Sequence, residues 1–200
     1  MATMDRRDAL RALASAPLAA AAITWTDTEA VAASQAAAQA RQTAQQTKAP
    51  YKPKFFTAAE WATVGVLVDV IIPRDEKSGS ATDAGVPEFM DFMMVDQPTR
   101  QTAMRGGLAW LEHECQVRFD KRFSACTDAE RRAVLDDISW PRRAKPEMAY
   151  GVTFFNSFRD LTASGFFTSK IGMADLQFKG NTVVMNWKGC PPEVMKKLGV

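Results

Sequence analysis

Histidine is almost absent from this chain, which has a single one, His113, among its 200 residues. A metal site built on a pair of histidines is therefore excluded, and a Ser-His-Asp triad would have to use that one imidazole. Cysteine is scarce as well. Three cysteines are too few for a small disulfide-stapled protein, and their spacing is wrong for a zinc site. Covalent haem attachment needs Cys-x-x-Cys-His, and no two cysteines are close enough to form it.

Other signatures of cofactor and nucleic-acid binding are missing too. The chain has neither a Gly-x-Gly-x-x-Gly turn for a dinucleotide nor a P-loop. The formal net charge is +2, from 25 lysines and arginines against 23 acidic residues, and this balance argues against a nucleic-acid partner. The mildly apolar run over residues 12–23 is shorter than the roughly 20 residues of a membrane-spanning helix. We expect no catalytic residue, no cofactor and no metal in this chain.

The apolar residues are unevenly distributed along the chain. Residues 1–50 contain 18 alanines and one aromatic residue, Trp25, and every other aromatic residue lies in residues 51–200. A core needs large apolar side chains because the free energy of burial scales with apolar area. With 46% hydrophobic and 24% charged residues, the chain as a whole is globular in composition. We therefore place one folded domain at residues 55–200.

Residues 1–32 have the layout of an export signal. The adjacent Arg6 and Arg7 precede the short apolar run, and small residues follow it. Paired arginines before a weak, alanine-rich run favour the twin-arginine route, which exports folded proteins. The alternative is an alanine-rich amphipathic helix that stays on the protein.

Residues 33–54 are expected to form a linker. Their Ser, Gln, Ala and Thr residues give way to lysines and prolines, which favour an extended chain over packed structure. Two places near its start, residues 30–32 (Ala-Val-Ala) and 36–38 (Ala-Ala-Ala), fit the small-x-small pattern of a signal cleavage site.

Capping signals and helical periodicity recur through the predicted domain. Residues 57–60 (Thr-Ala-Ala-Glu) and 127–130 (Thr-Asp-Ala-Glu) are capping boxes, each followed by apolar residues at helical spacing. Gly106 and Gly107 weaken one helix, a cost that a close helix crossing would offset. No β-alternation is convincing, so we predict an all-α fold, a small bundle of about five helices with an irregular C-terminal tail from residue 168. The predicted helices span residues 57–72, 88–95, 98–119, 127–138 and 147–162, with a polar loop at 74–84.

Three charged clusters offer little chemistry. In residues 112–114 (Glu-His-Glu), neighbouring side chains on a helix point apart and do not converge on a metal or a substrate. Residues 75–80 lack the alternating ligands and terminal Glu of a calcium loop, which leaves a solvent loop or a partner contact. The basic clusters at 131–132 and 142–145 either dock an acidic partner or are ordinary solvated charge.

The cysteines gain meaning if the chain is exported, because thiols oxidise outside the cytoplasm. Cys115 near a helix end and Cys126 in the following loop can plausibly meet and form a disulfide. Cys190, in a turn-rich tail, is then the candidate for a bridge to another chain. The alternative is that all three are reduced and packed.

Several stretches together resemble the small subunit (subunit 3, or gamma) of the gluconate 2-dehydrogenase family, over essentially all of residues 55–200. The matching stretches are residues 55–61 (Phe-Phe-Thr-Ala-Ala-Glu-Trp), 67–75 (Leu-Val-Asp-Val-Ile-Ile-Pro-Arg-Asp), 84–91 (Ala-Gly-Val-Pro-Glu-Phe-Met-Asp), 105–111 (Arg-Gly-Gly-Leu-Ala-Trp-Leu) and 187–191 (Trp-Lys-Gly-Cys-Pro).

The resemblance implies a non-catalytic partner of a large FAD-dependent dehydrogenase of the glucose-methanol-choline type. That large subunit oxidises sugars, sugar acids, polyols or glucosides, and a cytochrome c subunit with haem c takes the electrons. The resemblance further implies that the small subunit carries the signal for the twin-arginine translocation machinery, takes the folded flavin subunit to the periplasm, and helps it mature and stay stable. Membrane association would then come through the complex.

Aromatic residues are enriched at the cores of interfaces. Phe89, Phe92, Trp187 and the tail at Cys190 are therefore the residues that we expect at the partner interface. The competing hypothesis is an independent enzyme or ligand-binding protein, which would need a pocket that uses His113 or the loop of Asp75 and Asp83.

Overall fold

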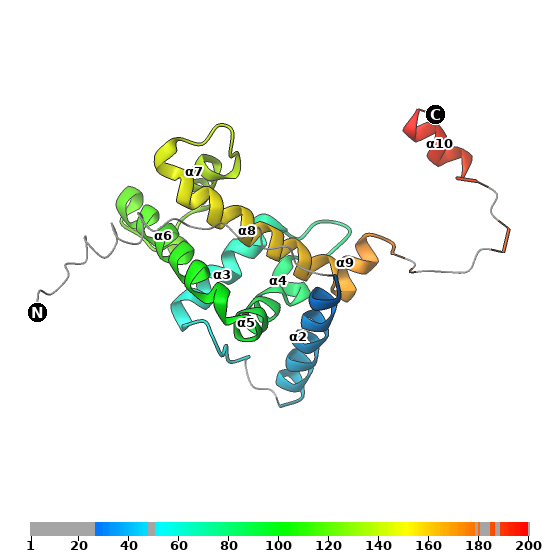
Figure 1. Cartoon of the computed structure of the whole chain (residues 1–200), viewed down its shortest axis with the longest axis horizontal. Coiled ribbons are helices and arrows are strands. Elements are labelled where there is room, and N and C mark those ends of the chain that lie inside the picture. Colours follow the sequence, from blue (N-terminus) through cyan, green and yellow to red (C-terminus); the bar gives the residue numbers. More distant parts are fainter. Residues whose placement is uncertain (1–26, 48–50, 179, 181–184, 187–188, 200) are drawn as a thin grey trace, which may run out of the picture.

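The structure, a computed structural model, describes residues 27–47, 51–178, 180, 185–186 and 189–199. As predicted, it is all-α: none of these residues lies in a β-strand (Figure 1). The elements in chain order are α2 (Asp27–Thr47), α3 (Ala58–Ile71), α4 (Ala81–Ala84), α5 (Val86–Asp96), η1 (Pro98–Arg100), α6 (Gln101–Phe119), η2 (Phe123–Ala125), α7 (Asp128–Ser139), η3 (Pro146–Met148), α8 (Ala149–Phe167), α9 (Lys170–Asp175) and α10 (Pro192–Leu198).

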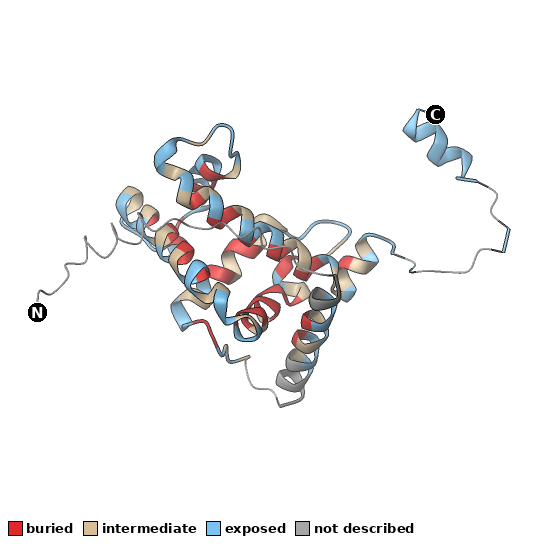
Figure 2. Ribbon diagram, in the orientation of Figure 1, coloured by how far each residue is buried: buried red, intermediate tan, exposed pale blue. Residues whose placement is uncertain are grey.

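Helix α8 is the centre of the bundle, because it contacts each of α2 to α7 and also α9. It continues to Phe167, five residues beyond its predicted end at residue 162. Its inward face carries large aromatic side chains, so the bundle closes around a phenylalanine-rich core. Figure 2 shows that the buried positions of the helices, in red, gather toward the middle of the bundle. The buried phenylalanines of α8 are Phe154, Phe155, Phe158 and Phe166.

Helices α6 and α8 cross closely, and glycine permits this crossing. A Cβ atom at Gly107 would lie 1.8 Å from the ring of Phe154, and one at Gly151 would lie 2.3 Å from the ring of Trp110. Real side chains cannot approach so closely, so these two positions must lack a Cβ. The close crossing expected at residues 106–107 is therefore confirmed.

Both predicted capping boxes are present. The Thr57 hydroxyl accepts from the Glu60 amide at 3.3 Å while the Glu60 carboxylate accepts from the Thr57 amide at 2.8 Å, and Thr127 and Glu130 do the same. A third box, Ser80 with Asp83, opens α4 inside the segment expected to be a polar loop. The chain turns directly from α4 into α5 at Gly85, whose φ of 85° is left-handed.

The expectation of an extended chain over residues 33–54 is wrong for residues 33–47, which belong to α2. This helix packs against α5 and α8 along the edge of the bundle (Figure 1). Ala33 and Ala37, one turn apart, are buried there, and small side chains let the two helices approach closely. Arg41, a further turn along, donates to the carbonyls of Asp83 at 2.7 Å and Thr82 at 3.4 Å, which closes the C-terminal end of α4.

The C-terminal segment is less irregular than predicted, because it contains two short helices. Helix α9 stays on the bundle: Gly172 is buried against the backbone of Phe166 and Phe167. Beyond α9 the chain leaves the bundle and ends in α10, which lies well away from the other helices (Figure 1). Among the described residues, no helix combines the length and the apolar character required to cross a membrane.

Candidate partner-docking surface

The C-terminal arm, residues 176–199, carries much of the exposed apolar surface of the described chain. The described residues include eleven exposed large hydrophobic side chains, and six of these lie on the arm. Phe178, one of the six, is 67% exposed. Soluble proteins do not usually gather such side chains in one short segment without a partner to cover them. The six are Leu176, Phe178, Met185, Val194, Met195 and Leu198.

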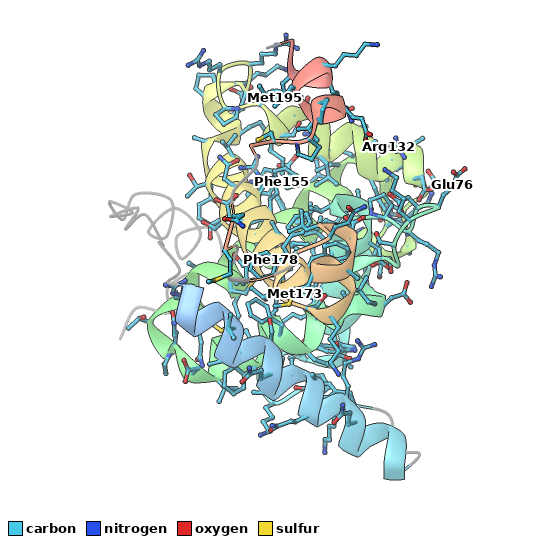
Figure 3. All side chains as sticks on the ribbon, turned by 90° about the vertical axis from the view of Figure 1, so that its right-hand side faces the viewer. Glu76, Arg132, Phe155, Met173, Phe178 and Met195 are labelled. Atoms are coloured by element: carbon cyan, nitrogen blue, oxygen red, sulfur yellow. The ribbon has the colours of Figure 1, made fainter. Side chains whose placement is uncertain are left out.

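Backbone geometry at the end of α9 directs the arm away from the bundle. Gln177 adopts a left-handed conformation with φ of 53°, and the Phe178 amide donates to the Met173 carbonyl at 3.0 Å. The Gln177 amide donates to the Ala174 carbonyl, also at 3.0 Å. This hydrogen-bond pattern ends a helix sharply. Figure 3 shows the result from the side on which the arm leaves: Phe178 lies next to α9 and Met195 lies on α10.

Helix α10 is a short amphipathic element. Pro192 opens it, the left-handed Gly199 ends it, and Lys196 and Lys197 occupy its last turn, where positive charge is favourable. Seven residues are too few for a stable isolated helix in water. Burial of its three exposed apolar side chains against another surface would therefore stabilise this helix.

A groove of about 570 Å³ between α3 and α7 offers a second concave surface. Its floor is mainly apolar and its rim carries charged residues of both signs. The residues that line it are Trp61, Ala62, Gly65, Val66, Asp69, Val70, Pro73, Thr82, Asp128, Arg131 and Arg132. Neither His113 nor the pair Asp75 and Asp83 lines this groove, so it does not bring together the residues that the hypothesis of an independent enzyme needs.

Most polar groups of the groove are already engaged within the chain. Asp69 accepts from the Thr82 amide at 2.7 Å. Arg131 pairs with Asp128 at 2.9 Å and donates to the carbonyls of Phe123 at 3.2 Å and Ser124 at 2.9 Å. Arg131 is therefore a structural residue that ties α7 to the turn before it. Arg132 beside it is exposed.

Of the predicted interface residues that the structure describes, Phe89 and Phe92 lie on α5, whereas Cys190 lies on the C-terminal arm. Phe89 is 1% exposed and lies against Gly165 in the core, so the interface prediction is corrected for Phe89: its aromatic ring packs α5 onto α8. Phe92, on the same helix, is half-buried and packs against the core. Cys190 is exposed on the arm. Trp187 lies outside the described residues, as do Arg6 and Arg7.

The acidic residues beside His113 point apart, as expected. Glu112 accepts from the Thr63 hydroxyl and, at 3.1 Å, from the Phe123 amide, whereas Glu114 pairs with Arg118 at 3.0 Å. His113 is exposed. Among the described residues, no group of three His, Cys, Asp or Glu side chains could hold a metal ion.

The loop at residues 75–80 satisfies its own carboxylate. Asp75 accepts from the amides of Lys77 at 2.8 Å and Ser78 at 2.7 Å, and these hydrogen bonds lower the pKa of Asp75. Asp83, at the end of α4, is held by the Ser80 amide and by Arg74, and its pKa is lowered first by the Ser80 hydrogen bond. Both carboxylates therefore have a structural role in holding this loop and the start of α4.

Sequence reasoning missed Asp91, a fully buried carboxylate on α5. Its two oxygens accept four hydrogen bonds, from the Tyr51 hydroxyl and from the amides of Lys54, Phe55 and Phe56, at 2.8–3.1 Å. Burial, then the charge of Asp91, raises the pKa of Tyr51. Because each acceptor site of Asp91 faces a donor, this carboxylate anchors residues 51–56 and does no chemistry.

Glu88, one turn before Phe92 on α5, faces α2. Its carboxylate lies 3.6 Å from the Arg41 guanidinium and is only 13% exposed. Burial raises the pKa of Glu88, although its own backbone amide and Arg41 oppose the shift. The pair links α2 to the bundle.

These features define a class of protein: a small helical bundle whose C-terminal arm carries exposed apolar side chains. The chain belongs to the family described as gluconate 2-dehydrogenase subunit 3, whose sequence model matches residues 58–188. As the description of the family says, its members are subunits of a multisubunit dehydrogenase. Neither the curated proteins nor the solved structures contain a match to this chain.

Proposed function

We propose that this chain is the non-catalytic small subunit of a periplasmic FAD-dependent dehydrogenase that oxidises a sugar, a sugar acid or a glucoside. FAD belongs to its large partner, of the glucose-methanol-choline type, and a cytochrome c subunit with haem c receives the electrons. The small subunit supports the export, maturation and stability of the flavin subunit. Membership of the subunit 3 family supports this assignment.

The observation that carries the proposal is the C-terminal arm. Burying one large apolar side chain stabilises a complex by about 1.5–3 kcal/mol, and the described part of the arm offers six. An arm that leaves the bundle can reach over a partner that is larger than the bundle itself. The exposed Cys190 sits within this segment, where it can contact the partner.

Export is the second element of the proposal. A flavoprotein must fold around its cofactor before it leaves the cytoplasm, and the twin-arginine route carries folded proteins. A single signal on the small subunit, at Arg6 and Arg7, then serves both chains. The docking surface keeps the flavin subunit attached during the transfer.

The test is capture of this chain from its own host with an antibody, followed by an absorbance spectrum of the eluate. We expect a yellow complex with a larger protein that reduces a dye when given a sugar or sugar acid. The double variant Leu176→Ser/Phe178→Ser should weaken the complex by about 100-fold, since each lost apolar contact is worth roughly tenfold or more.

Val117→Ser is the matched control, because Val117 on α6 is 68% exposed, about as much as Phe178, but lies on the bundle. It should leave the yellow complex intact. A colourless chain on its own, captured gently while the flavoprotein is expressed, would contradict the accessory role. Undiminished binding by the arm variant would instead show that the partner docks elsewhere.

A further inference from the structure

Two of the three cysteines are buried in the core, one on each side of the turn that joins α6 to α7. Cys115 is in the last turns of α6 and is 0% exposed, and Cys126 follows η2 and is 3% exposed. Both are free thiols and both belong to the main apolar cluster. They come from two elements that the chain brings together by reversing its direction after α6.

The turn between the two cysteines is held against α6 by hydrogen bonds. Asp120 adopts a left-handed conformation with φ of 54°, which reverses the chain. The Phe123 amide then donates to Glu112 of α6 at 3.1 Å, and the Cys126 amide donates to the carbonyls of Arg122 at 3.1 Å and Phe123 at 3.2 Å. Arg131 of α7 donates to the carbonyls of Phe123 and Ser124 in the same turn. Cys126 is therefore placed by the fold and not by a loose loop.

Cys126 is close enough to Cys115 for its thiol to influence the ionisation of Cys115. Burial first, and then Cys126, raises the pKa of Cys115 to about 12. A thiol attacks only as its thiolate, so the raised pKa makes Cys115 unreactive in the closed fold, and burial shields both sulfurs from reagents in solution. The same closeness makes each of them the natural partner of the other.

We propose that Cys115 and Cys126 form an intramolecular disulfide that staples the end of α6 to the start of α7. Each thiol loses one hydrogen, one S–S bond forms between the two Sγ atoms, and the two electrons and two protons reduce the disulfide of an oxidant to two thiols. The oxidant is a thiol oxidoreductase in its disulfide form in the cell, or oxidised glutathione in solution. The reaction proceeds when the turn opens locally, because both thiols are buried in the closed fold and out of reach of the oxidant.

This proposal rests on the proposed function only for the compartment, since an oxidising periplasm is where such a bond persists. Its chemistry belongs to this chain alone. The test therefore uses the purified full-length chain without any partner, so that a failure of the docking or export proposals does not affect it.

The experiment is thiol counting on the variant Cys190→Ser, which removes the exposed cysteine and leaves the core untouched. The chain is incubated with oxidised glutathione or with a reductant, denatured, alkylated with a maleimide and analysed by intact mass and peptide mapping. We expect two labels after reduction. After oxidation we expect none, together with a linked pair of peptides that contain Cys115 and Cys126. Its Tm should then exceed that of the reduced chain by about 5–10 °C.

Cys126→Ser in the same background is the control. Cys115 should then stay labelled after oxidation, which shows that its protection requires the partner cysteine. This result does not depend on the stability of the variant, because labelling takes place in denaturant. Two labels on the oxidised Cys190→Ser chain, or glutathione attached to either core cysteine, would overturn the proposal.

Discussion

At the scale of single residues, the buried carboxylate of Asp91 depends most strongly on its hydrogen-bond donors. Asp91 is fully buried, and its carboxylate accepts hydrogen bonds from three backbone amides and one hydroxyl. Hydrogen bonds to a charged acceptor are stronger than those between neutral groups. One side chain thus fixes the entry of the chain into α3, in place of regular secondary structure.

Asp91→Asn should destabilise the chain by about 3 kcal/mol, because the new amide NH₂ group would face donors and leave buried groups unpaired. Tyr51→Phe removes only the hydroxyl contact and should cost about 1 kcal/mol. Both values come from urea unfolding followed by tryptophan fluorescence. Equal effects of the two variants would mean that the backbone contacts to Asp91 contribute little.

At the scale of helices, glycine has two opposite roles. Gly107 in α6 is required, since any Cβ there would overlap the Phe154 ring, whereas a Cβ at Gly65 in α3 would meet nothing within 4 Å. Gly65 lines the groove between α3 and α7. Gly65 therefore lowers the stability of α3 in the free chain, and no close packing inside the chain requires a glycine at this position.

Gly107→Ala should destabilise the chain by about 1–3 kcal/mol through overpacking of the α6–α8 crossing. Gly65→Ala should stabilise it by up to about 1 kcal/mol, because alanine is the better helix former. Thermal unfolding of the two variants beside the parent chain measures both effects. The idea of a glycine-dependent crossing fails if the two substitutions shift Tm in the same direction.

Helix α2 and the capping boxes show what the sequence could and could not predict. The boxes at Thr57 and Thr127 were evident because an apolar helical pattern follows each. The box at Ser80 opens only four residues, so no periodicity accompanies it. Helix α2 buries alanines, which leave no hydrophobic pattern against an alanine-rich background.

The docking surface was predicted only in part, again for physical reasons. The tail stays a predicted contact segment. Phe89 could not be distinguished from an interface residue by sequence, because large aromatic side chains occur in both cores and interfaces. Asp91 gave no signal at all. Its partners are mostly backbone amides, and any sequence supplies those.

At the scale of the whole molecule, the proposed signal and the proposed docking arm lie at opposite ends of the chain. The helical bundle lies between them along the chain. Under the proposed function, the flavin subunit binds the C-terminal arm and is exported by means of the N-terminal signal. Loss of either the arm or the signal should therefore leave the flavin subunit in the cytoplasm.

The double variant Arg6→Lys/Arg7→Lys should reduce periplasmic dye-reducing activity to background while the complex still assembles in the cytoplasm. Lysine keeps the charge, so the effect would report recognition of the arginine pair. Arg11→Lys, in the same segment, is the control and should leave periplasmic activity unchanged. Normal periplasmic activity of the double variant would exclude this signal as the export route.

Helix α2 has a consequence for how the chain is processed. Both places where the small-residue pattern suggests peptidase cleavage, residues 30–32 and 36–38, lie within its helical backbone. Proteases cut exposed, extended backbone far more readily than packed helix. A cut after residue 38 would also remove Ala33 and Ala37 from their places against α5. Because the proposed route exports the chain already folded, the docking of α2 would protect both places from cleavage, and α2 would then stay on the mature chain.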